Sequence, residues 1–497
     1  MSGIVGIFNK SGLAIESQVL ETMLQSLAHR GPDGSNIWQG DGIGLGHCML
    51  WTTPESLTEV LPYRNAVTDL VITADARIDN REDLINALAL NIANAKSISD
   101  SEIILAAYHK WGQDCPSHLL GDFAFAIWDS RKQTLFCARD HFGIKPFYYC
   151  NGDQYFIFAS EIKALLSVPD VSRQLNERRI ADYFLEPMLD SKSDTVYEEI
   201  FRLPPAHWVN VAAQVDFKPH CYWSLDCTAT LTMPTDEDYA AAFREIFFEA
   251  VRCRLRSAFP VGSHLSGGLD SSAITCVAHE LLEQSSHTLH TFSNIFDRIS
   301  SCDEREYFNV VLDQGRYTPH LIEADRLGPF SEWQDFFQYL DEPFLGPSHF
   351  LLRGLNRATK QAGVRICLDG FDGDTVVSHG AFYFTELAHL GNWETFIAEA
   401  NAVSKHFDTS PEVLLLGYAM PYLSELARRN QWLTFAKRAE EISQVFTVSR
   451  RKLWIQYGLK PLFPRWALGI FRNIKYGSAL DDKQAKEQPN RALTQFL

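Results

Sequence analysis

The chain has 497 residues, of which 46% are hydrophobic and 22% are charged, a composition typical of globular proteins. Because this length exceeds what one hydrophobic core usually supports, we expect two domains. The formal net charge of −17 argues against non-specific nucleic-acid binding, which requires a basic surface.

Ten cysteines are scattered along the chain without a CxxC pair, which indicates reduced thiols rather than a disulfide framework. The first residues lack the basic and apolar regions of a signal peptide, and no run of about 18 apolar residues occurs. These features predict a cytoplasmic protein with no membrane partner.

Short apolar runs separated by turn signals fill the first part of the chain. The runs LVITADARI, FAFAIWD, TLFCARD and QYFIFAS are typical of strands, and helical spacing occurs over residues 17–29 and 101–111. This pattern predicts a β-rich domain over residues 1–210, with two or more sheets and a few helices.

The stretch MSGIVGIFNK places Ser2 directly before a predicted strand. Removal of Met1 would expose an amine beside the Ser2 hydroxyl, and such an amine can act as the base for a nucleophile. From these residues alone, Ser2 is either a nucleophile or the remnant of one.

Clusters of Pro, Thr and Asp over residues 211–235 predict a linker. Beyond it, the strand-like runs PVGSHL, LHTFSNIF and VRIC alternate with helical segments, which predicts a parallel α/β sheet with helices on both faces over residues 236–497. The stretch after His379 has a helical pattern. Two of its segments, FTELAHLGNW and LSELARRNQW, share ELA and a later Trp, either as copies of a repeat or by chance.

The stretch SGGLDSS lies between the strand PVGSHL and a predicted helix. Gly267 and Gly268 allow backbone N–H groups to turn toward an anion, at a helix N-terminus that also favours negative charge. Ser266, Ser271 and Ser272 add hydroxyl donors. Because the lysine of the GxxxxGK[ST] loop is absent, the stretch suits pyrophosphate better than the γ-phosphate of a kinase-type site.

Acidic residues supply the expected metal site. Asp270 lies within this loop, and Mg²⁺ prefers carboxylates together with phosphate oxygens. A second acidic stretch, LDGFDGD, follows the strand VRIC. Because loops at the carboxyl ends of parallel strands converge, we expect Asp374 to meet Asp270 across a bound nucleotide. The residues therefore predict a nucleotide pyrophosphate bound together with Mg²⁺.

Several motifs together resemble the asparagine synthetase family. HRGPDG, DFAFAIWD, ARDHFGIKPFYY, FASEIKALL and LSGGLDSS occur in the order found in that family, over the stretch from Ser2 to about Gly380. The resemblance implies an N-terminal glutamine amidotransferase type 2-like domain with the αββα sandwich of Ntn hydrolases. It also implies a C-terminal parallel-sheet α/β adenylating domain of the PP-loop ATP pyrophosphatase type. In that family a carboxylate attacks ATP to give an acyl-AMP, and an amine then displaces AMP.

The same resemblance assigns roles in the second domain. Asp270 and Asp374 would hold Mg²⁺, and nine residues would bind ATP or pyrophosphate: Leu265, Ser266, Gly267, Gly268, Asp270, Ser271, Ser272, Ser293 and Gly370. Of these, Leu265, Ser293 and Gly370 would lie near the adenosine.

The first domain departs from the glutaminase pattern of the family. Ser2 replaces the nucleophilic cysteine, Met49 replaces the arginine that clamps glutamine, and Asp75-Ala76 replaces the Asn-Gly pair that supports the oxyanion. Asp100 alone matches, as the acid that holds the amine of glutamine. A hydroxyl is far less acidic than a thiol, and an aspartate would repel the developing negative charge. We therefore expect no glutaminase activity, and an amine that arrives with the substrate or as ammonia.

Relatives without a glutaminase include the β-lactam synthetases and the lasso-peptide cyclases. HCMLWTTPESL, ITADARIDNR and LDGFDGDTVVSHG look most like the cyclases. This resemblance implies a macrocyclase that joins an Asp or Glu side chain of a precursor peptide to the N-terminal amine of that peptide. A leader peptidase and a leader-binding protein would be its partners. The alternatives are asparagine or another small amide made from ammonia, asparagine made from glutamine if the altered domain still works, and a non-catalytic member.

Further departures concern the chemical step. Phe371 stands where the family has a Glu or Tyr, so the neighbouring Asp372 is the candidate base. The late lysine of the family has no clear counterpart, and Lys452, Lys460 and Lys475 are candidates by position only. The Glu-x-Arg…Pro-Phe…Asp signature of the usual C-terminal segment is also missing, which predicts a shortened second domain.

Overall fold

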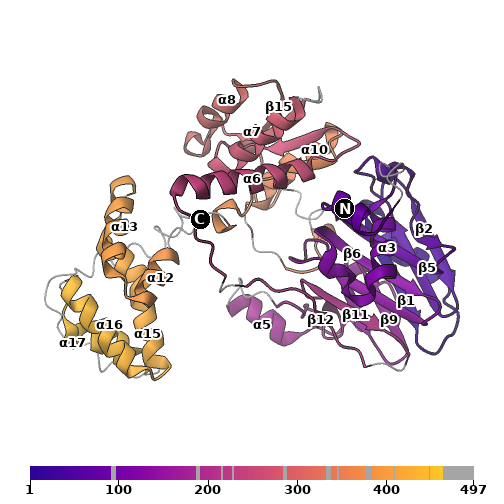
Figure 1. Ribbon diagram of the computed structural model, residues 1–497, viewed down its shortest axis with the longest axis horizontal. Helices are drawn as coiled ribbons and strands as arrows, with labels where there is room; N and C mark the ends of the chain where they lie inside the picture. The colour runs from indigo at the N-terminus through magenta and orange to yellow at the C-terminus, as the bar shows by residue number, and fades with distance from the viewer. Residues whose placement is uncertain are drawn as a thin grey trace. The chain divides into compact units, whose positions relative to one another are not determined.

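The computed structural model describes residues 1–90, 97–185, 191–213, 216–226, 229–283, 288–331, 337–343, 346, 348–376, 382–407, 409–446 and 448–462. The chain forms two compact units, Met1–Gly370 and Phe371–Leu497 (Figure 1). The first unit contains three sheets, and the described part of the second is helical.

Two six-stranded antiparallel sheets make up the first part of the chain. One has the order β10–β8–β9–β1–β3–β2, with β1 (Gly3–Asn9), β2 (Ser35–Gly40), β3 (Ile43–Cys48), β8 (Tyr148–Asn151), β9 (Tyr155–Ala159) and β10 (Phe201–Arg202). The other has the order β12–β11–β7–β6–β5–β4, with β4 (Tyr63–Asn65), β5 (Leu70–Ile78), β6 (Gly121–Asp129), β7 (Thr134–Arg139), β11 (His207–Val211) and β12 (His220–Cys221). β12 lies within the stretch that the sequence predicted to be a linker.

The two sheets stack face to face, and helices cover their outer faces. In β1, Ile4 and Phe8 belong to the core between the sheets, whereas Val5 and Ile7 belong to the core under α1 (Ser17–Ser26). α3 (Asp100–Trp111) packs on β5 of the other sheet. Because both faces of each sheet are buried, the strands carry apolar residues at consecutive positions. The result is the predicted αββα sandwich. The remaining helices of this part are α2 (Arg81–Ala87), α4 (Ile162–Leu165) and α5 (Glu177–Leu185).

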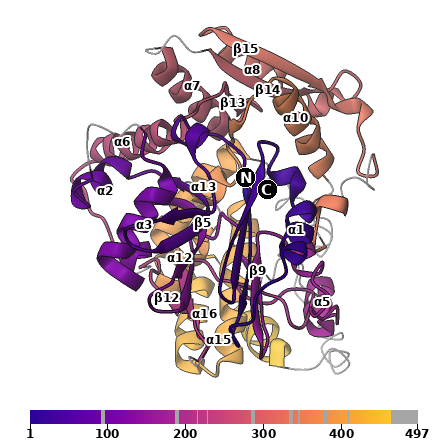
Figure 2. The same ribbon diagram turned by 90° about the vertical axis from the view of Figure 1, so that its right-hand side faces the viewer.

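A four-stranded parallel sheet completes the first unit. Its order is β15–β14–β13–β16, with β13 (Val261–His264), β14 (Leu289–Ile295), β15 (Tyr317–Glu323) and β16 (Ile366–Leu368). Its helices are α6 (Asp236–Arg254), α7 (Leu269–Glu283), α8 (Arg305–Leu312) and α10 (His349–Gln361). α7 packs against β13 and β14, and α10 packs against β14 and β15, on the two sides of the sheet (Figure 2). The predicted strands PVGSHL, LHTFSNIF and VRIC are β13, β14 and β16.

The second unit begins with α11 (Gly373–Val376) and continues as two successive sets of helices. The first set is α12 (Phe382–Leu390), α13 (Trp393–His406), α14 (Pro411–Leu414) and a π-helical turn (Leu415–Ala419). The second set is α15 (Met420–Arg428), α16 (Trp432–Val445), α17 (Arg450–Leu453) and a π-helical turn (Trp454–Leu459). A short 3-10 turn, Lys460–Leu462, follows.

The two sets match each other position by position at a spacing of 39 residues. Gly391 and Asn430 both have positive φ between the first two helices of their set, at 72° and 57°. The helices that follow are both 14 residues long and begin at a tryptophan. Phe396 and Phe435 are both fully buried in the common core. The two ELA segments are therefore corresponding parts of a helical repeat and not a chance match.

The nine cysteines that the structure describes form no disulfide, as the sequence predicted; Cys227 lies outside the described residues. Among the described residues, no helix combines the length and apolar character needed to cross a membrane.

Candidate functional site

The predicted pyrophosphate loop connects β13 to α7. Gly267 has a φ of +93°, and a Cβ at this position would lie 2.7 Å from Cβ of Tyr307 and 3.0 Å from the backbone nitrogen of Phe308. Backbone of this kind, closely backed by α8, accepts only glycine without strain. At Gly268 the closest atom to an added Cβ would be Oγ of Ser266 at 3.4 Å, so the loop can be approached from that side.

The loop serines bond to each other across its mouth. Oγ of Ser266 lies 2.9 Å from Oγ of Ser271, and the backbone N–H of Gly268 donates to Oγ of Ser266 at 3.3 Å. Ser271 and Asp270 lie in the first turn of the 15-residue helix α7. An anion at this end of the helix would meet N–H groups, hydroxyls and the positive end of the helix dipole.

Three other predicted nucleotide residues lie against the same loop. The hydroxyl of Ser293 donates to the carbonyl of Leu265 at 2.5 Å, and the N–H of Leu265 donates to the carbonyl of Phe292 at 2.9 Å. A Cβ on Gly370 would lie 2.7 Å from the backbone nitrogen of Ser271. The structure thus gathers Leu265, Ser293 and Gly370 around the loop; their contact with adenosine remains a prediction.

The donor set at this loop is suited to ATP and Mg²⁺. The described residues contain no cluster of three or more His, Cys, Asp or Glu side chains that could hold a metal ion without help. A single carboxylate, Asp270, beside a phosphate-binding loop fits an ion that arrives with the phosphates of its nucleotide.

The acidic stretch LDGFDGD spans the boundary between the two compact units, because Gly370 ends the first unit and Phe371 begins the second. The side chain of Phe371 is 84% exposed, and Asp372 is exposed with a φ of 64°. Asp374 lies in α11, but its side chain is outside the described part of the structure. The expected meeting of Asp374 with Asp270 therefore remains a prediction, as does Asp372 as the base.

The late-lysine candidates all belong to the second unit. Lys452 lies in α17 and Lys460 in the turn that follows the second helical set, while Lys475 lies outside the described residues. Their role in acyl transfer stays a prediction.

Ser2 and Met49 are built into the sandwich. Ser2 is 8% exposed, and its Oγ accepts a hydrogen bond from the N–H of Leu50 at 3.0 Å. Met49 is 6% exposed and belongs to the apolar core under α3. Met49, at the position where a glutamine-clamping arginine was expected, is thus part of the hydrophobic core.

Asp75 is buried beside Ala76 within β5 of the sandwich, and Lys145 donates to it at 2.8 Å. Burial by itself would raise the pKa of Asp75, but Lys145 and the amine of Met1 outweigh it and lower the pKa. Asp75 is therefore an anion. Burial lowers the pKa of the Met1 amine to about 6, against the opposing effect of Asp75. An anion at the position expected to support an oxyanion would oppose glutamine hydrolysis, and the absence of that activity stays a prediction.

Asp100 is engaged by other groups of this chain. It accepts hydrogen bonds from Arg256 at 2.7 and 3.2 Å, from the N–H of Ile78 at 3.1 Å, and from Arg81. Glu55 lies in the same network, with Arg256 at 3.1 Å. Both oxygens of Asp100 thus have cationic partners within the chain, and its role toward the amine of glutamine stays a prediction.

Three contacts between charged residues could not be predicted from the sequence. Arg256 follows α6, 156 residues after Asp100, and no local pattern signals their contact. Arg365, before β16, pairs with Asp33 of HRGPDG in the same way, with one contact at 2.9 Å. Two oppositely charged residues at strand ends, His264 and Asp369, also meet beside the loop.

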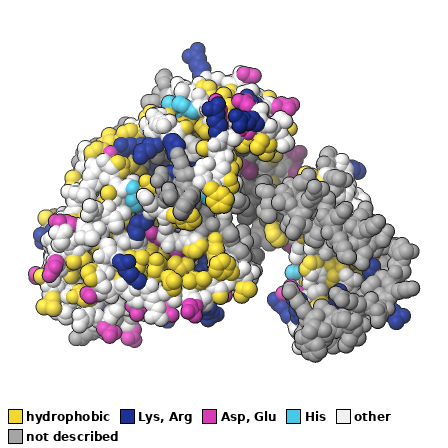
Figure 3. Space-filling view, turned by 180° about the vertical axis from the view of Figure 1, so that it is seen from behind, with side chains coloured by type: hydrophobic (Ala, Val, Ile, Leu, Met, Phe, Trp, Pro, Cys, Tyr) yellow, Lys and Arg dark blue, Asp and Glu magenta, His cyan; other side chains and the backbone are white. Residues whose placement is uncertain are grey.

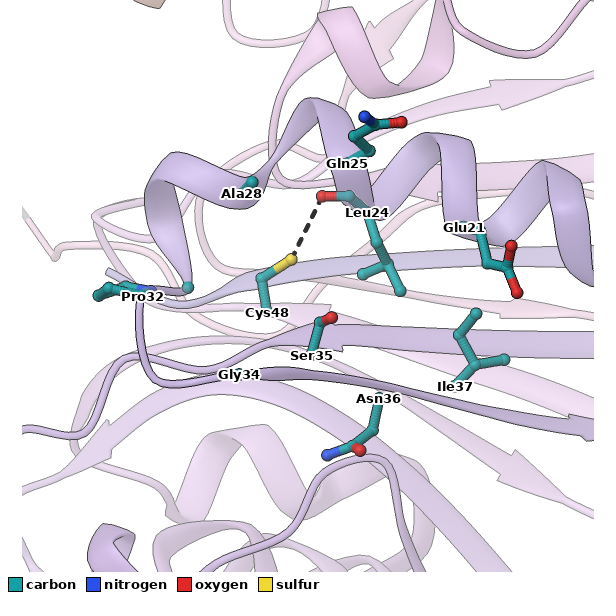
Figure 4. Close-up of a pocket in the computed structure, with 11 residues that line it drawn as sticks. Glu21, Leu24, Gln25, Ala28, Pro32, Gly34, Ser35, Asn36, Ile37 and Cys48 are labelled. Atoms are coloured by element: carbon teal, nitrogen blue, oxygen red, sulfur yellow. Dashed lines mark hydrogen bonds between the residues drawn. The ribbon is translucent and has the colours of Figure 1, made fainter.

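Two clefts among the described residues of the first unit lie away from this loop. One of about 640 Å³ opens between α1 and the strands β2 and β3 and includes Cys48, whose Sγ lies 3.5 Å from the carbonyl of Leu24 (Figure 4). Burial raises the pKa of Cys48 to about 11, so its thiol is protonated and unreactive at neutral pH. A second, apolar cleft of about 430 Å³ lies between α5 and residues 337–343. Figure 3 shows hydrophobic side chains gathered in a band on one face of the first unit.

Residues 1–223 match the glutamine amidotransferase domain family, and residues 242–488 match the asparagine synthase family. The putative glutamine-hydrolysing asparagine synthetase 2 of Methanocaldococcus jannaschii is 30% identical over 407 residues, which cover 76% of this chain and 75% of that protein. The chain belongs to the asparagine synthetase family.

Other relatives in the asparagine synthetase family carry different names. The glutamine-hydrolysing asparagine synthetase 3 of Bacillus subtilis is 33% identical, over 65% of this chain and 53% of that protein. Amidase chry2 of Gibberella zeae is 26% identical, over 78% of this chain and 57% of that protein. The chain thus spans a little more than half the length of these two relatives.

Proposed function

We propose that this chain is an ATP-dependent, AMP-forming carbon–nitrogen ligase that takes its amine from a source other than glutamine. The proposal rests on the difference between the loop after β13 and the predicted glutaminase positions of the sandwich. The loop between β13 and α7 has the glycines, the serines and Asp270 that a nucleotide site needs. In the sandwich, Asp75 and Asp100 are held in buried ion pairs with side chains of the chain itself.

The reaction would proceed in two steps. A carboxylate oxygen of the substrate attacks the α-phosphorus of ATP, and pyrophosphate leaves as the acyl-AMP forms. The amine nitrogen then attacks the acyl carbon, AMP leaves with the electrons of the carbon–oxygen bond, and the nitrogen gives up a proton. The loop would bind the departing pyrophosphate, Asp372 would accept the proton, and Asp270 and Asp374 would hold the Mg²⁺ that neutralises the phosphate charge.

The finer proposal is a peptide macrocyclase of the lasso type. It is supported by the resemblance of HCMLWTTPESL, ITADARIDNR and LDGFDGDTVVSHG to such cyclases, by the burial of Met49 and by the ion pairs of Asp75 and Asp100. The Asp or Glu side chain and the N-terminal amine would belong to one precursor peptide. Holding the two ends together can lower the barrier by roughly 7–11 kcal/mol. A leader peptidase and a leader-binding protein would act with the enzyme in the cytoplasm.

Amidation of a small carboxylate with ammonia is the second candidate. The names of the relatives favour it, since two of the three described above are asparagine synthetases. A ligase of this kind would use the same adenylation step, with free aspartate as the carboxylate.

Isotope exchange between pyrophosphate and ATP tests these proposals with the full chain. We expect exchange that depends on a precursor peptide and is lost in Asp270→Asn. Exchange with free aspartate, followed by asparagine on addition of ammonia, would favour the second candidate. Absence of exchange with every carboxylate offered would contradict both and leave a non-catalytic member. Glutamine should release no glutamate, and release that is abolished by Ser2→Ala would refute the proposed amine source.

A further inference from the structure

His264 and Asp369 form a buried contact that the proposed reaction does not use. Nδ1 of His264 lies 2.8 Å from Oδ2 of Asp369, and His264 is only 9% exposed. The two residues terminate neighbouring strands of the parallel sheet. Ser263 of β13 pairs with Leu368 of β16, and His264 and Asp369 come next in the same register.

Each member of the pair precedes a segment of the nucleotide site. His264 is followed by Leu265 and the pyrophosphate loop, and Asp369 is followed by Gly370. Gly370 in turn lies against the start of α7, where an added Cβ would be 2.7 Å from the backbone nitrogen of Ser271. The contact between His264 and Asp369 therefore joins the two segments that approach each other at Ser271.

The pair is charged at neutral pH. Burial alone would lower the pKa of His264, but the hydrogen bond to Asp369 and the proximity of Cys367 outweigh it and raise the pKa to about 9. Nε2 of His264 is buried and has no hydrogen-bond partner among the described residues. A buried N–H without an acceptor lowers the stability of the fold. A histidine at this position is therefore unfavourable if its only role is packing.

We propose that His264 and Asp369 are a positioning pair for the nucleotide site. Their ion pair fixes the end of β16 to the end of β13, which keeps Gly370 against Ser271 and the loop in the shape that binds the phosphates of ATP. The proposal rests on the proposed function only in assigning ATP to this loop. Neither side chain is required to touch the nucleotide.

Two substitutions of the same residue separate positioning from packing. In His264→Leu the bond to Asp369 is lost, whereas in His264→Asn a side-chain amide can take the place of Nδ1 and keep it. The full chain is titrated calorimetrically with ATP and Mg²⁺ at pH 7.5. We expect His264→Leu to weaken ATP binding about tenfold or more, as removal of residues that orient a ligand site commonly does. His264→Asn should stay within about threefold of the wild type.

The pH profile adds a readout that packing alone would not move. As the pH rises through about 9, where His264 loses its positive charge, the ATP affinity of the wild type should fall toward that of His264→Asn, by no more than about threefold, and that of His264→Asn should not change. The titratable groups that act on His264 are Cys367 from β16 and Asp369 directly after it, while β14 contributes the uncharged ring of Phe292. A wild-type profile identical to that of His264→Asn would overturn the charged-pair proposal.

Hydrogen exchange of the ligand-free chain tests the proposal without ATP. We expect faster exchange over residues 266–272 and at Gly370 in His264→Leu, and wild-type rates there in His264→Asn. Equal exchange and equal ATP binding in a folded His264→Leu would overturn the proposal. A wild type that binds no ATP while His264→Leu loosens the loop would contradict the proposed function and leave the positioning pair supported.

Discussion

Asp100 and Glu249 both pair with arginines, but in different surroundings. The Asp100 side chain is 8% exposed and faces Arg81 and Arg256, which are 10% and 19% exposed. The Glu249 and Arg252 side chains are each 58% exposed on α6. Water screens the charges of Glu249 and Arg252, but it screens those of Asp100 and its arginines much less. Removing one partner therefore leaves a poorly compensated charge only in the buried network.

We expect Asp100→Asn to lower the free energy of unfolding of the first unit by about 3 kcal/mol, because Arg81 and Arg256 lose one of the two buried carboxylates, Asp100 and Glu55, that pair with them. Glu249→Gln should change it by less than about 1 kcal/mol. Urea unfolding of the full chain, followed by hydrogen exchange of α3, provides the measurement. Equal effects of the two substitutions would refute the structural role of Asp100.

His47 contributes a pH dependence of its own. It is 1% exposed, its Nδ1 lies 3.2 Å from Oγ1 of Thr73, and burial lowers its pKa from 6.5 to about 4. The unfolded chain therefore binds a proton at a higher pH than the folded chain does. The stability that the neutral ring contributes above pH 6.5 is lost as the pH falls toward 4.

We expect the titration of His47 to lower the free energy of unfolding by about 2 kcal/mol between pH 7.5 and pH 5. His47→Asn, which keeps a donor near Thr73 but does not titrate, should lose correspondingly less stability over this range. Melting temperatures of both proteins at pH 7.5 and pH 5 give the comparison. Parallel curves for the two proteins would contradict a neutral, buried His47.

At the scale of elements, the connection between β13 and α7 depends on the absence of a side chain at Gly267. Its φ of +93° and its distance to Tyr307 rule out a Cβ without movement of α8. Gly328 is different, since an added Cβ would meet only Oγ of Ser331, at 3.7 Å. These two glycines give a matched comparison.

We expect Gly267→Ala to weaken ATP binding at least tenfold, because the loop N–H groups would turn away from the phosphates. Strain at positive φ would also cost about 1–2 kcal/mol of stability. Gly328→Ala should leave both quantities close to the wild-type values. Calorimetric titration with ATP and Mg²⁺ measures the affinity. An unchanged affinity in Gly267→Ala would exclude the loop as the phosphate site.

The sequence predicted elements well where the signal was local. LVITADARI is β5 over the full Leu70–Ile78, and the helix expected over residues 101–111 is α3, Asp100–Trp111. The helix expected over 17–29 ends earlier, at Ser26. The pairing partners of Asp75, Asp100 and Asp369 could not be predicted, because each contact joins residues 70 to 156 positions apart and depends on how the sheets stack.

At the scale of the whole molecule, two cores of different kinds stabilise the two units. The first unit rests on the stacked and parallel sheets, and the second on a helical core that includes Leu423, which is fully buried. Leu433, on α16 of the same unit, is 90% exposed. Because the core of the second unit is its own, we expect it to unfold as a separate cooperative segment.

We expect Leu423→Ala to lower the unfolding free energy of the helical unit by about 3 kcal/mol, through lost burial and the cavity that remains. Leu433→Ala should change it by no more than about 0.5 kcal/mol. Hydrogen exchange of α13 and α16 reports on this unit, and exchange of β5 and β6 reports on the other. Destabilisation of both units by Leu423→Ala would show that they unfold together.

The helical repeat gives the chain an internal alignment of itself. Positions where the copies agree, such as Phe396 with Phe435 and Ala400 with Ala439, are fully buried and record what the helical scaffold requires. Some positions where they differ, such as Phe384 and Leu423, are also buried in this core, so it is the exposed differing positions that mark where each copy can specialise. Exchanging only the exposed residues that differ between the copies would therefore transplant a surface while keeping the buried core, and would show which copy contributes to binding of the proposed peptide substrate.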